Sequence, residues 1–416
     1  MTIWRRLWTA VPDQTQRLRR ALVVVVLAQW LGTSLWFSPS GAADGLMLRW
    51  SIDTAGFGWL IAATQLGFIA GTLVFAVTAA ADRFSASRIF AVSSVIGAAA
   101  NAALVVPHLG YEQAWSLRFA VGLCLAGIYP LGMKMIVHWV GGKPATALAW
   151  LVAMLTLGTA MPHGLRASDA SLPWEAVVLG SSALAVLGAV LVYALGDGPF
   201  ATTTVRPGAT SSGALRQTFK VPGFRASALG YFGHMWELYA FWALLPWLCQ
   251  PLSAELLKRS GSQGGSMVAV LSFAVMAAGS IGCVCGGLLS KRIGSARVAA
   301  AALAGSGLMC LLYPLIPEHA LALHLVALFF WGFCVVADSP QFSALSAHFA
   351  SPQSLGSALV AQNGIGFLIS VVSILLLSYA VPVWGTSAMW LLAPGPMLGL
   401  WALRPLLGRR QPSKLI

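Results

Sequence analysis

Long apolar runs recur along the whole chain, and they limit the folds that it can adopt. These runs begin near residues 21, 56, 88, 114, 144, 173, 226, 266, 297, 319, 354 and 384. Each is about 20 residues long, the length that an α-helix needs to cross the hydrocarbon core of a bilayer. Only 9% of the 416 residues are charged, whereas soluble domains carry about 25%. The sequence therefore predicts an all-α polytopic membrane protein with twelve transmembrane helices.

The formal net charge is +13, and the distribution of the basic residues predicts the orientation in the membrane. With both termini in the cytoplasm, the segments on that side hold 19 of the 25 Lys and Arg residues. This excess follows the positive-inside rule. No polar segment is long enough to form a soluble domain with a basic face, which argues against nucleic acid as a partner. We therefore expect a multi-pass protein of the plasma membrane, the inner membrane in a bacterium, with both termini cytoplasmic.

Two sequence echoes at half the chain length indicate an internal duplication. Residues 82–88 read DRFSASR and residues 291–297 read KRIGSAR, an offset of 209. A second pair, YP at 129–130 and SP at 339–340, has an offset of 210. Repeats at a fixed offset are typical of duplicated architectures. The sequence thus predicts two pseudo-symmetric bundles of six helices each.

The boundary between the two halves is the longest polar stretch of the chain. Residues 197–225 are rich in Gly, Pro, Ser and Thr and carry four basic residues, a composition typical of a linker. The predicted organisation is a cytoplasmic N-terminal tail (1–20), an N-terminal bundle (21–196), a cytoplasmic linker (197–225), a C-terminal bundle (226–407) and a cytoplasmic C-terminal tail (408–416).

These features resemble the major facilitator superfamily (MFS), whose fold is two six-helix bundles joined by such a loop. The signature of that superfamily between helices two and three has the form GxLADRxGRR. The corresponding segment here reads TAAADRFSASR and keeps Asp82, Arg83 and Arg88. The second-half copy reads GLLSKRIGSAR and keeps Arg292, but it has Lys291 in place of the acid. The resemblance implies a cytoplasmic gate at Asp82, Arg83, Arg88 and Arg292. The alternative is that the arginines only anchor the helices at the cytoplasmic side, and for Arg292 this alternative is favoured.

The run GYFGHMWELYAFW at residues 230–242 carries two titratable groups, His234 and Glu237, one helical turn apart on one face. In a helix from about 226 to 248, Glu237 lies at the middle of the membrane. A charged side chain there costs roughly 2.5 to 3.5 kcal/mol on insertion scales, so such groups usually face a bundle interior or a watery cavity. Either this acid gains and loses a proton during a transport cycle, or it belongs to a permanently satisfied polar pair that fixes helix packing. We favour proton coupling.

Further residues of the predicted pathway come from the resemblance, which places helices one, four, seven and ten around a central cavity. Asp338, in the inner half of helix ten, joins His234 and Glu237 as a proton-coupling residue, with a helix cap or an ion pair as its alternative role. A second motif of the superfamily, RxxxG, is similar to Arg118 and Gly122 in helix four. The residues predicted to line the substrate cavity are Gln29, Arg118, Tyr129, Tyr231 and Phe241. On a straight fourth helix, Arg118 and Tyr129 differ by only about 20° in direction.

The function predicted from these residues is secondary active transport of a small solute by alternating access, coupled to protons through Glu237. Arg118 adds the weaker prediction that the solute is an organic anion. The alternatives are an efflux carrier for small amphipathic compounds, an intramembrane enzyme, or a non-transporting receptor; an enzyme is not favoured. The six cysteines lack metal-ligand spacing, so neither a metal nor a cofactor is expected. The expected partners are the solute, the proton and the lipid bilayer, with the protein a monomer.

Overall fold

The computed structural model describes residues 14–78, 80–140, 145–169, 172–201, 217–260, 267–350 and 355–408. The regular structure of these residues is helical, and they contain no β-strand. Most of both predicted tails and residues 202–216 of the predicted linker lie outside the described residues. The predicted domain boundaries therefore stay predictions.

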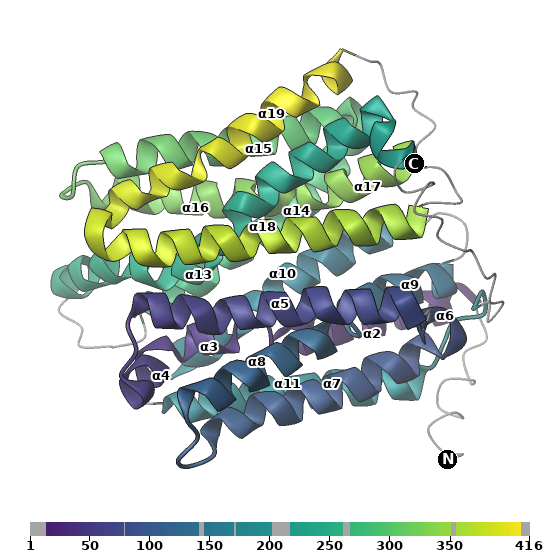
Figure 1. The fold of residues 1–416 in the computed structure, drawn as a ribbon, viewed down its shortest axis with the longest axis horizontal. Coiled ribbons are helices and arrows are strands. Elements are labelled where there is room, and N and C mark those ends of the chain that lie inside the picture. The colour runs from purple at the N-terminus through teal and green to yellow at the C-terminus, as the bar shows by residue number, and fades with distance from the viewer. Residues whose placement is uncertain are drawn as a thin grey trace.

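The helices of the N-terminal half form one group, coloured purple to teal in Figure 1. They are α2 (Gln14–Thr33), α3 (Ser38–Gly41), α4 (Ala43–Trp50), α5 (Thr54–Thr78), α6 (Ala80–Arg83), α7 (Ala86–Ala102), the short 3₁₀ helix η1 (Ala103–Val105), α8 (Tyr111–Leu125), α9 (Tyr129–Val140), α10 (Ala145–Ser168) and α11 (Trp174–Leu195).

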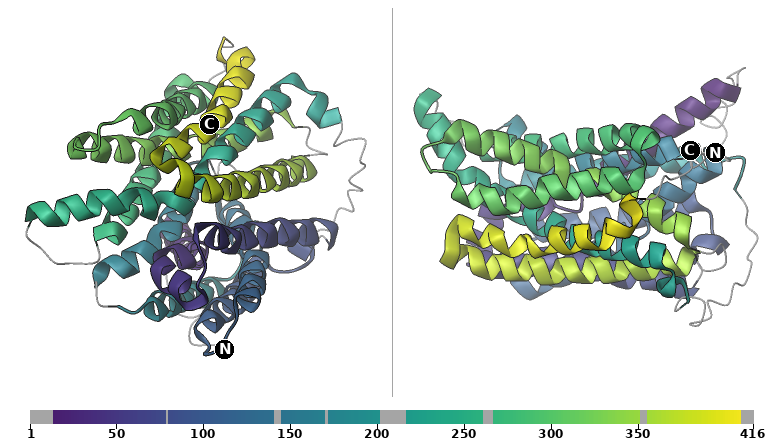
Figure 2. Two further views of the ribbon diagram at one scale, coloured as in Figure 1. Left: turned by 60° about the vertical axis from the view of Figure 1, so that its left-hand side comes forward. Right: turned by 90° about the horizontal axis from the view of Figure 1, so that it is seen from above.

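The helices of the C-terminal half form a second group, coloured teal to yellow, beside the first (Figures 1 and 2). They are α13 (Pro222–Ser260), α14 (Met267–Ile293), α15 (Ser295–Leu312), η2 (Tyr313–Leu315), α16 (Leu321–Ala337), α17 (Ser339–Phe349), α18 (Leu355–Trp384), η3 (Gly385–Leu392) and α19 (Pro394–Leu407). The twelfth apolar run, predicted from about 384, begins as 3₁₀ helix, and its α-helix starts only at Pro394.

Nine segments of the described residues are long and apolar enough to cross a membrane, and the last of them, Ala358–Leu407, contains most of α18 and all of α19. Helices α2 and α13 stand where the first and seventh spans are predicted but are not among the nine. The first turns of α2 carry three arginines, and α13 carries His234 and Glu237 within its apolar part. The prediction of an all-α multi-pass membrane protein is confirmed, and the count of twelve spans stays a prediction.

Helices four and ten are interrupted at corresponding points of the two halves. Residues 126–128 separate α8 from α9, and Asp338 separates α16 from α17. The second residue of each following helix is a proline, Pro130 or Pro340, and the first turn tolerates proline because its N–H groups have no intrahelical partner. The two breaks fall on the second pair of sequence echoes, which supports the inferred duplication.

The two halves meet along two pairs of helices, with α5 packed against α18 and α10 against α14. Gly58 of α5 faces Ser378 of α18 so closely that a side chain at Gly58 would collide with the serine hydroxyl. Near this contact, the Trp59 indole Nε1 donates a hydrogen bond of 3.3 Å to the hydroxyl of Tyr379. Small residues at a helix contact let the backbones approach, as is common in membrane proteins.

Candidate functional site

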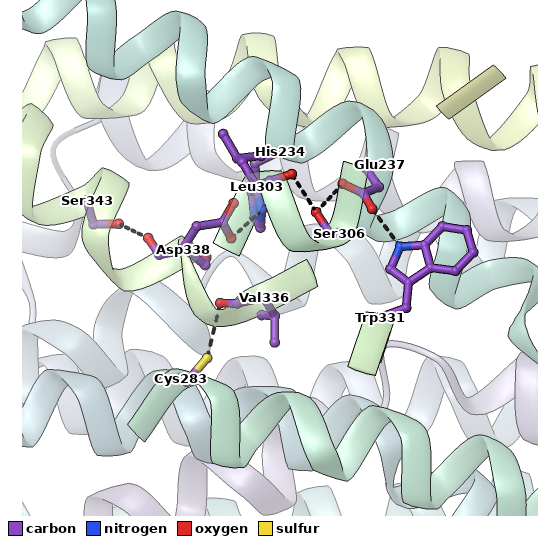
Figure 3. Close-up of polar contacts among 10 residues, drawn as sticks. His234, Glu237, Cys283, Leu303, Ser306, Trp331, Val336, Asp338 and Ser343 are labelled. Carbon is purple, nitrogen blue, oxygen red and sulfur yellow. Dashed lines mark hydrogen bonds and ion pairs between the residues drawn. The ribbon is translucent and has the colours of Figure 1, made fainter. Parts of the chain in front are cut away.

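The Glu237 carboxyl group lies inside the C-terminal half, and three side chains donate hydrogen bonds to it. Figure 3 shows the bonds from Ser306 and Trp331. The donors are Nε1 of Trp331 at 2.6 Å, Oγ of Ser306 at 2.8 Å and Sγ of Cys310 at 3.3 Å. The Glu237 side chain comes from α13, whereas its partners come from α15 and α16. Glu237 is only 1% exposed. The carboxyl group therefore joins three helices of one half.

His234, one turn before Glu237, faces Asp338 at the break between α16 and α17. Its Nδ1 lies 2.8 Å from Oδ1 of Asp338, and both side chains are buried. The distance is that of an ion pair, although the angles at these atoms are not those of a hydrogen bond. Nε2 of His234 and Oδ2 of Asp338 have no hydrogen-bond partner among the described residues. Asp338 directly precedes α17, and a carboxylate is favoured at the N-terminus of a helix.

The face of α13 that carries these groups continues with aromatic rings. The Phe241 ring stacks on Trp331 with centroids 4.5 Å apart, and the Tyr231 ring lies 6.4 Å from that of Phe342 on α17. Tyr231, His234, Glu237 and Phe241 therefore share one face, as their spacing indicates. This face packs against α15, α16 and α17 of its own half. A role of Tyr231 or Phe241 in binding solute stays a prediction.

Arg118 lies inside the N-terminal half, and its guanidinium group is fully bonded there. Its N–H groups donate to the carbonyls of Leu35 (3.0 Å) and Trp36 (2.7 Å) in the turn that ends α2. They also donate to the side chains of Ser38 at 3.3 Å, Thr64 at 3.1 Å and Asn101 at 2.8 Å. A guanidinium group has five N–H donors, so none is left for a solute in this conformation.

The fourth span is not straight, so the shared face that a straight helix would give Arg118 and Tyr129 does not apply. Residues 126–128 leave the helix before Tyr129, so a constant angle per residue does not connect the two positions. Arg118 is fully buried, and Tyr129 is half-buried at the start of α9. Their roles toward a solute stay predictions. The same holds for Gln29, which lies against Gly132 of α9 and has no amide hydrogen bond among the described residues.

The residues of the predicted cytoplasmic gate are only partly described. The side chain of Asp82 lies outside the described residues, and those of Arg83, Arg88 and Arg292 are exposed. Asp197, which follows α11, accepts a hydrogen bond of 2.9 Å from the backbone N–H of Ser87 in the first turn of α7. Sequence reasoning placed Asp197 in the linker and did not assign it this contact. The Lys134 ammonium group also ties α9 to this region, because it donates to the carbonyl of Ala81.

The three donors to Glu237 are not among the residues predicted from the sequence. Ser306, Cys310 and Trp331 lie within apolar runs and have no distinctive spacing in the sequence. The signal that could have found them is the need of a buried carboxyl group for donors on neighbouring helices. Within the described ranges, no group of three or more His, Cys, Asp or Glu side chains is placed to hold a metal ion.

Two groups of helices, each with a polar network around a buried charged residue, define a two-bundle membrane protein. The profile of the Major Facilitator Superfamily matches residues 20–370. The chain belongs to the major facilitator superfamily. This membership indicates a transporter of small molecules, embedded in a membrane, rather than an enzyme.

Solved structures with the same fold share little sequence with this chain. One is a bacterial homologue of the human lysosomal transporter Spinster, in an inward-facing and unoccupied conformation. It is 15% identical, with a TM-score of 0.64 over 94% of this chain and 95% of that one. Another is a point mutant of the nucleoside transporter NupG. It is 13% identical, with a TM-score of 0.70 over 94% of this chain and all of that one. No curated protein sequence matches the chain.

Proposed function

We propose that the protein is a proton-coupled secondary transporter that moves a small solute across the bacterial inner membrane by alternating access. It works as a monomer with both termini in the cytoplasm. One observation carries the proposal. Two carboxyl groups and one imidazole, those of Glu237, Asp338 and His234, are buried together in the C-terminal half, and no Lys or Arg side chain is among the contacts described for them. Titratable groups buried in a membrane protein commonly belong to proton pathways.

The hydrogen bonds of Glu237 connect its protonation state to the packing of helices. As a carboxylate, it accepts from donors on α15 and α16. A proton added to one oxygen turns that oxygen into a donor, so its bond with the Trp331 or Ser306 side chain must change. A ligand, here a proton, that binds one of two conformations more tightly shifts the population toward that conformation. In this way a proton bound at Glu237 would favour one arrangement of α13 relative to α15 and α16.

The His234 and Asp338 pair extends this connection toward the break between α16 and α17. Asp338 belongs to neither helix interior, so a change in its charge acts where the tenth span is already interrupted. An imidazole ring carries a proton on one or on both nitrogens, so it can accept a proton and pass it on. We propose that these two residues pass the proton between Glu237 and water when the conformation changes.

The prediction of an anionic solute is not part of this proposal. It depends on Arg118, whose N–H groups are engaged by five acceptors of the protein. Contact with an anion would require that some of these bonds break in another conformation. Proton coupling does not depend on this point.

The test uses purified protein in proteoliposomes and solutes chosen by their effect on its melting temperature. A ligand that binds only the native state raises this temperature by mass action. We expect an imposed pH gradient to drive accumulation of such a solute, and Glu237→Gln or Asp338→Asn to abolish the accumulation while solute still equilibrates slowly. Glu255→Gln is the matched control, because Glu255 is exposed and paired with Arg259 at 2.8 Å. Solute accumulation that does not depend on the pH gradient, or that persists in Glu237→Gln, would contradict the proposal.

A further inference from the structure

Six aromatic rings meet where the two halves face each other. We call them the seam cluster: Trp36, Phe37 and Phe68 from the N-terminal half, and Tyr239, Trp242 and Phe367 from the C-terminal half. Trp36 and Phe37 stand in the turn after α2, Phe68 on α5, Tyr239 and Trp242 on α13, and Phe367 on α18. The ring centroids of the contacting pairs are 4.5 to 6.1 Å apart. Because each half supplies three rings, any change in the relative position of the halves changes this cluster.

The seam cluster contains hydrogen-bond donors that the protein does not use. The indole Nε1 groups of Trp36 and Trp242 are buried and have no acceptor among the described residues. Buried indole N–H groups usually find a partner. The buried indole of Trp331 does so, because it donates to Glu237. The indole groups of Trp30 and Trp139 also lack an acceptor among the described residues, but neither ring belongs to the seam cluster. Two unpartnered donors in one cluster point to an acceptor that comes from outside the chain.

A carboxamide without partners lies next to these rings. Gln65 is one turn before Phe68 on α5 and shares its face by spacing. Its side chain is fully buried, and neither the oxygen nor the nitrogen of its amide has a partner among the described residues. An amide offers two donors and one acceptor oxygen. The polar groups near the seam cluster are therefore neutral and rich in donors.

The surroundings of the seam cluster do not favour a charged ligand. The cation–ring contacts found among the described residues involve Arg49, with Trp50 and Trp174, and none involves these six rings. Arg118 reaches the backbone carbonyl of Trp36, but its N–H groups are fully used by the protein. An anion buried among these rings would lack an opposite charge, which is costly. A cation would meet the unpartnered N–H donors of Trp36 and Trp242 instead of acceptors.

We propose that the seam cluster is the solute site of this transporter, and that the solute is a flat, uncharged aromatic compound with hydrogen-bond acceptors. This inference rests on the proposed transport function and names its substrate class. In the present conformation the rings of the two halves contact one another, so the solute enters after the halves have separated there. Its ring then replaces the contacts between rings of opposite halves, and its acceptors take the N–H groups of Trp36 and Trp242.

The test measures equilibrium binding of coumarin to the full chain in nanodiscs, with binding to empty nanodiscs subtracted. Coumarin is flat and neutral and has a carbonyl acceptor, and coumarin-3-carboxylate is its charged counterpart. We expect saturable coumarin binding and about tenfold weaker binding of the carboxylate. We also expect Trp36→Phe and Trp242→Phe, which keep a ring and remove the N–H, each to weaken coumarin binding by about tenfold, the loss of one hydrogen bond. Trp384→Phe is the matched control, since Trp384 is exposed and outside the cluster.

Several results would overturn the inference: no saturable binding of coumarin, tighter binding of the carboxylate, or equal affinities in Trp36→Phe, Trp242→Phe and Trp384→Phe. If a tryptophan variant does not fold, Gln65→Leu is the second variant to measure, and it should also weaken coumarin binding. The binding measurement uses no pH gradient. A negative result would therefore refute this solute class while proton-driven accumulation of another solute could still succeed, and failure of that accumulation would refute the transport mechanism instead.

Discussion

The indole Nε1 of Trp331 donates to Oε1 of Glu237 across 2.6 Å, the shortest of the three contacts that hold this carboxyl group. The same indole ring stacks on Phe241, one helical turn further along α13. Trp331 thus joins α16 to α13 through both a polar and an apolar contact. Both helices belong to the C-terminal half, so the network around Glu237 connects helices within that half.

Replacement of Trp331 by phenylalanine separates these two contacts. Trp331→Phe keeps a ring for stacking and removes the donor, so we expect the free energy of unfolding to fall by about 1.5 to 3 kcal/mol, the range for a hydrogen bond to a charged group. The matched control is Trp390→Phe, which removes a partly exposed donor to the Leu311 carbonyl and should cost about 1 kcal/mol or less. Denaturation in mixed micelles measures both. Equal losses would show that the Glu237 contact has no special importance.

The contacts of Arg118 predict a large effect of a substitution that keeps its charge. Arg118→Lys retains the positive charge but cannot reach five acceptors at once. Buried carbonyl groups of the turn after α2 then lose their donors, and we expect a loss of at least about 2 kcal/mol, since each unsatisfied group costs about 1 to 3 kcal/mol. Arg297→Lys, at an exposed position of α15, should change stability by less than about 0.5 kcal/mol. Thermal melting of the two variants side by side checks the difference.

For two glycines in spanning helices, we expect replacement by alanine to have opposite effects on stability. A Cβ at Gly67 would collide with the carbonyl oxygen of Phe119 on α8, whereas one at Gly364 of α18 meets nothing within 4 Å. Gly67→Ala must push α5 away from α8, at a cost of about 1 to 3 kcal/mol. Gly364→Ala should leave stability unchanged or raise it by up to about 1 kcal/mol, because alanine is the better helix former. Unfolding in the same detergent compares them, and a destabilised Gly364→Ala would contradict this account of the packing.

The hydrogen bond from Trp59 to Tyr379 connects the two halves, so its removal should favour conformations in which α5 and α18 have separated. Tyr379→Phe loses about 0.5 to 1.5 kcal/mol, which corresponds to a shift of about two- to tenfold in the equilibrium between the conformations. Distances between spin labels near residues 59 and 379 report this shift. Tyr193→Phe, at an exposed position of α11, is the control. An unchanged distance distribution in Tyr379→Phe would refute the role of this bond.

The sequence predicts the class of the fold because the apolar runs are local. Eleven of the twelve predicted starts fall within about seven residues of an α-helix start that the structure describes. The twelfth differs because Gly385, with φ of 56°, begins a 3₁₀ segment. Helical periodicity likewise placed His234 and Glu237 on one face. Each of these inferences needs only neighbouring residues.

The partners of the buried groups could not be predicted in the same way. Ser306, Cys310 and Trp331 are 69 to 94 residues away from Glu237 in sequence, and their approach depends on how whole helices pack. The direction of Arg118 relative to Tyr129 could not be predicted either, because Pro130 marks a possible kink but does not fix the break at residues 126–128. The seam cluster combines residues from both halves, so periodicity within any one helix does not reveal it.

The central claim is that the buried acid at Glu237 exchanges its proton with water during the transport cycle. Infrared difference spectra of the protein in lipid, recorded between low and high pH in H₂O and in D₂O, follow the carboxyl C=O band of this residue. We predict a band that appears at low pH, shifts in D₂O, and is absent from Glu237→Gln. The absence of any such Glu237-dependent band over the pH range of transport, or a band that never shifts in D₂O, would contradict the account.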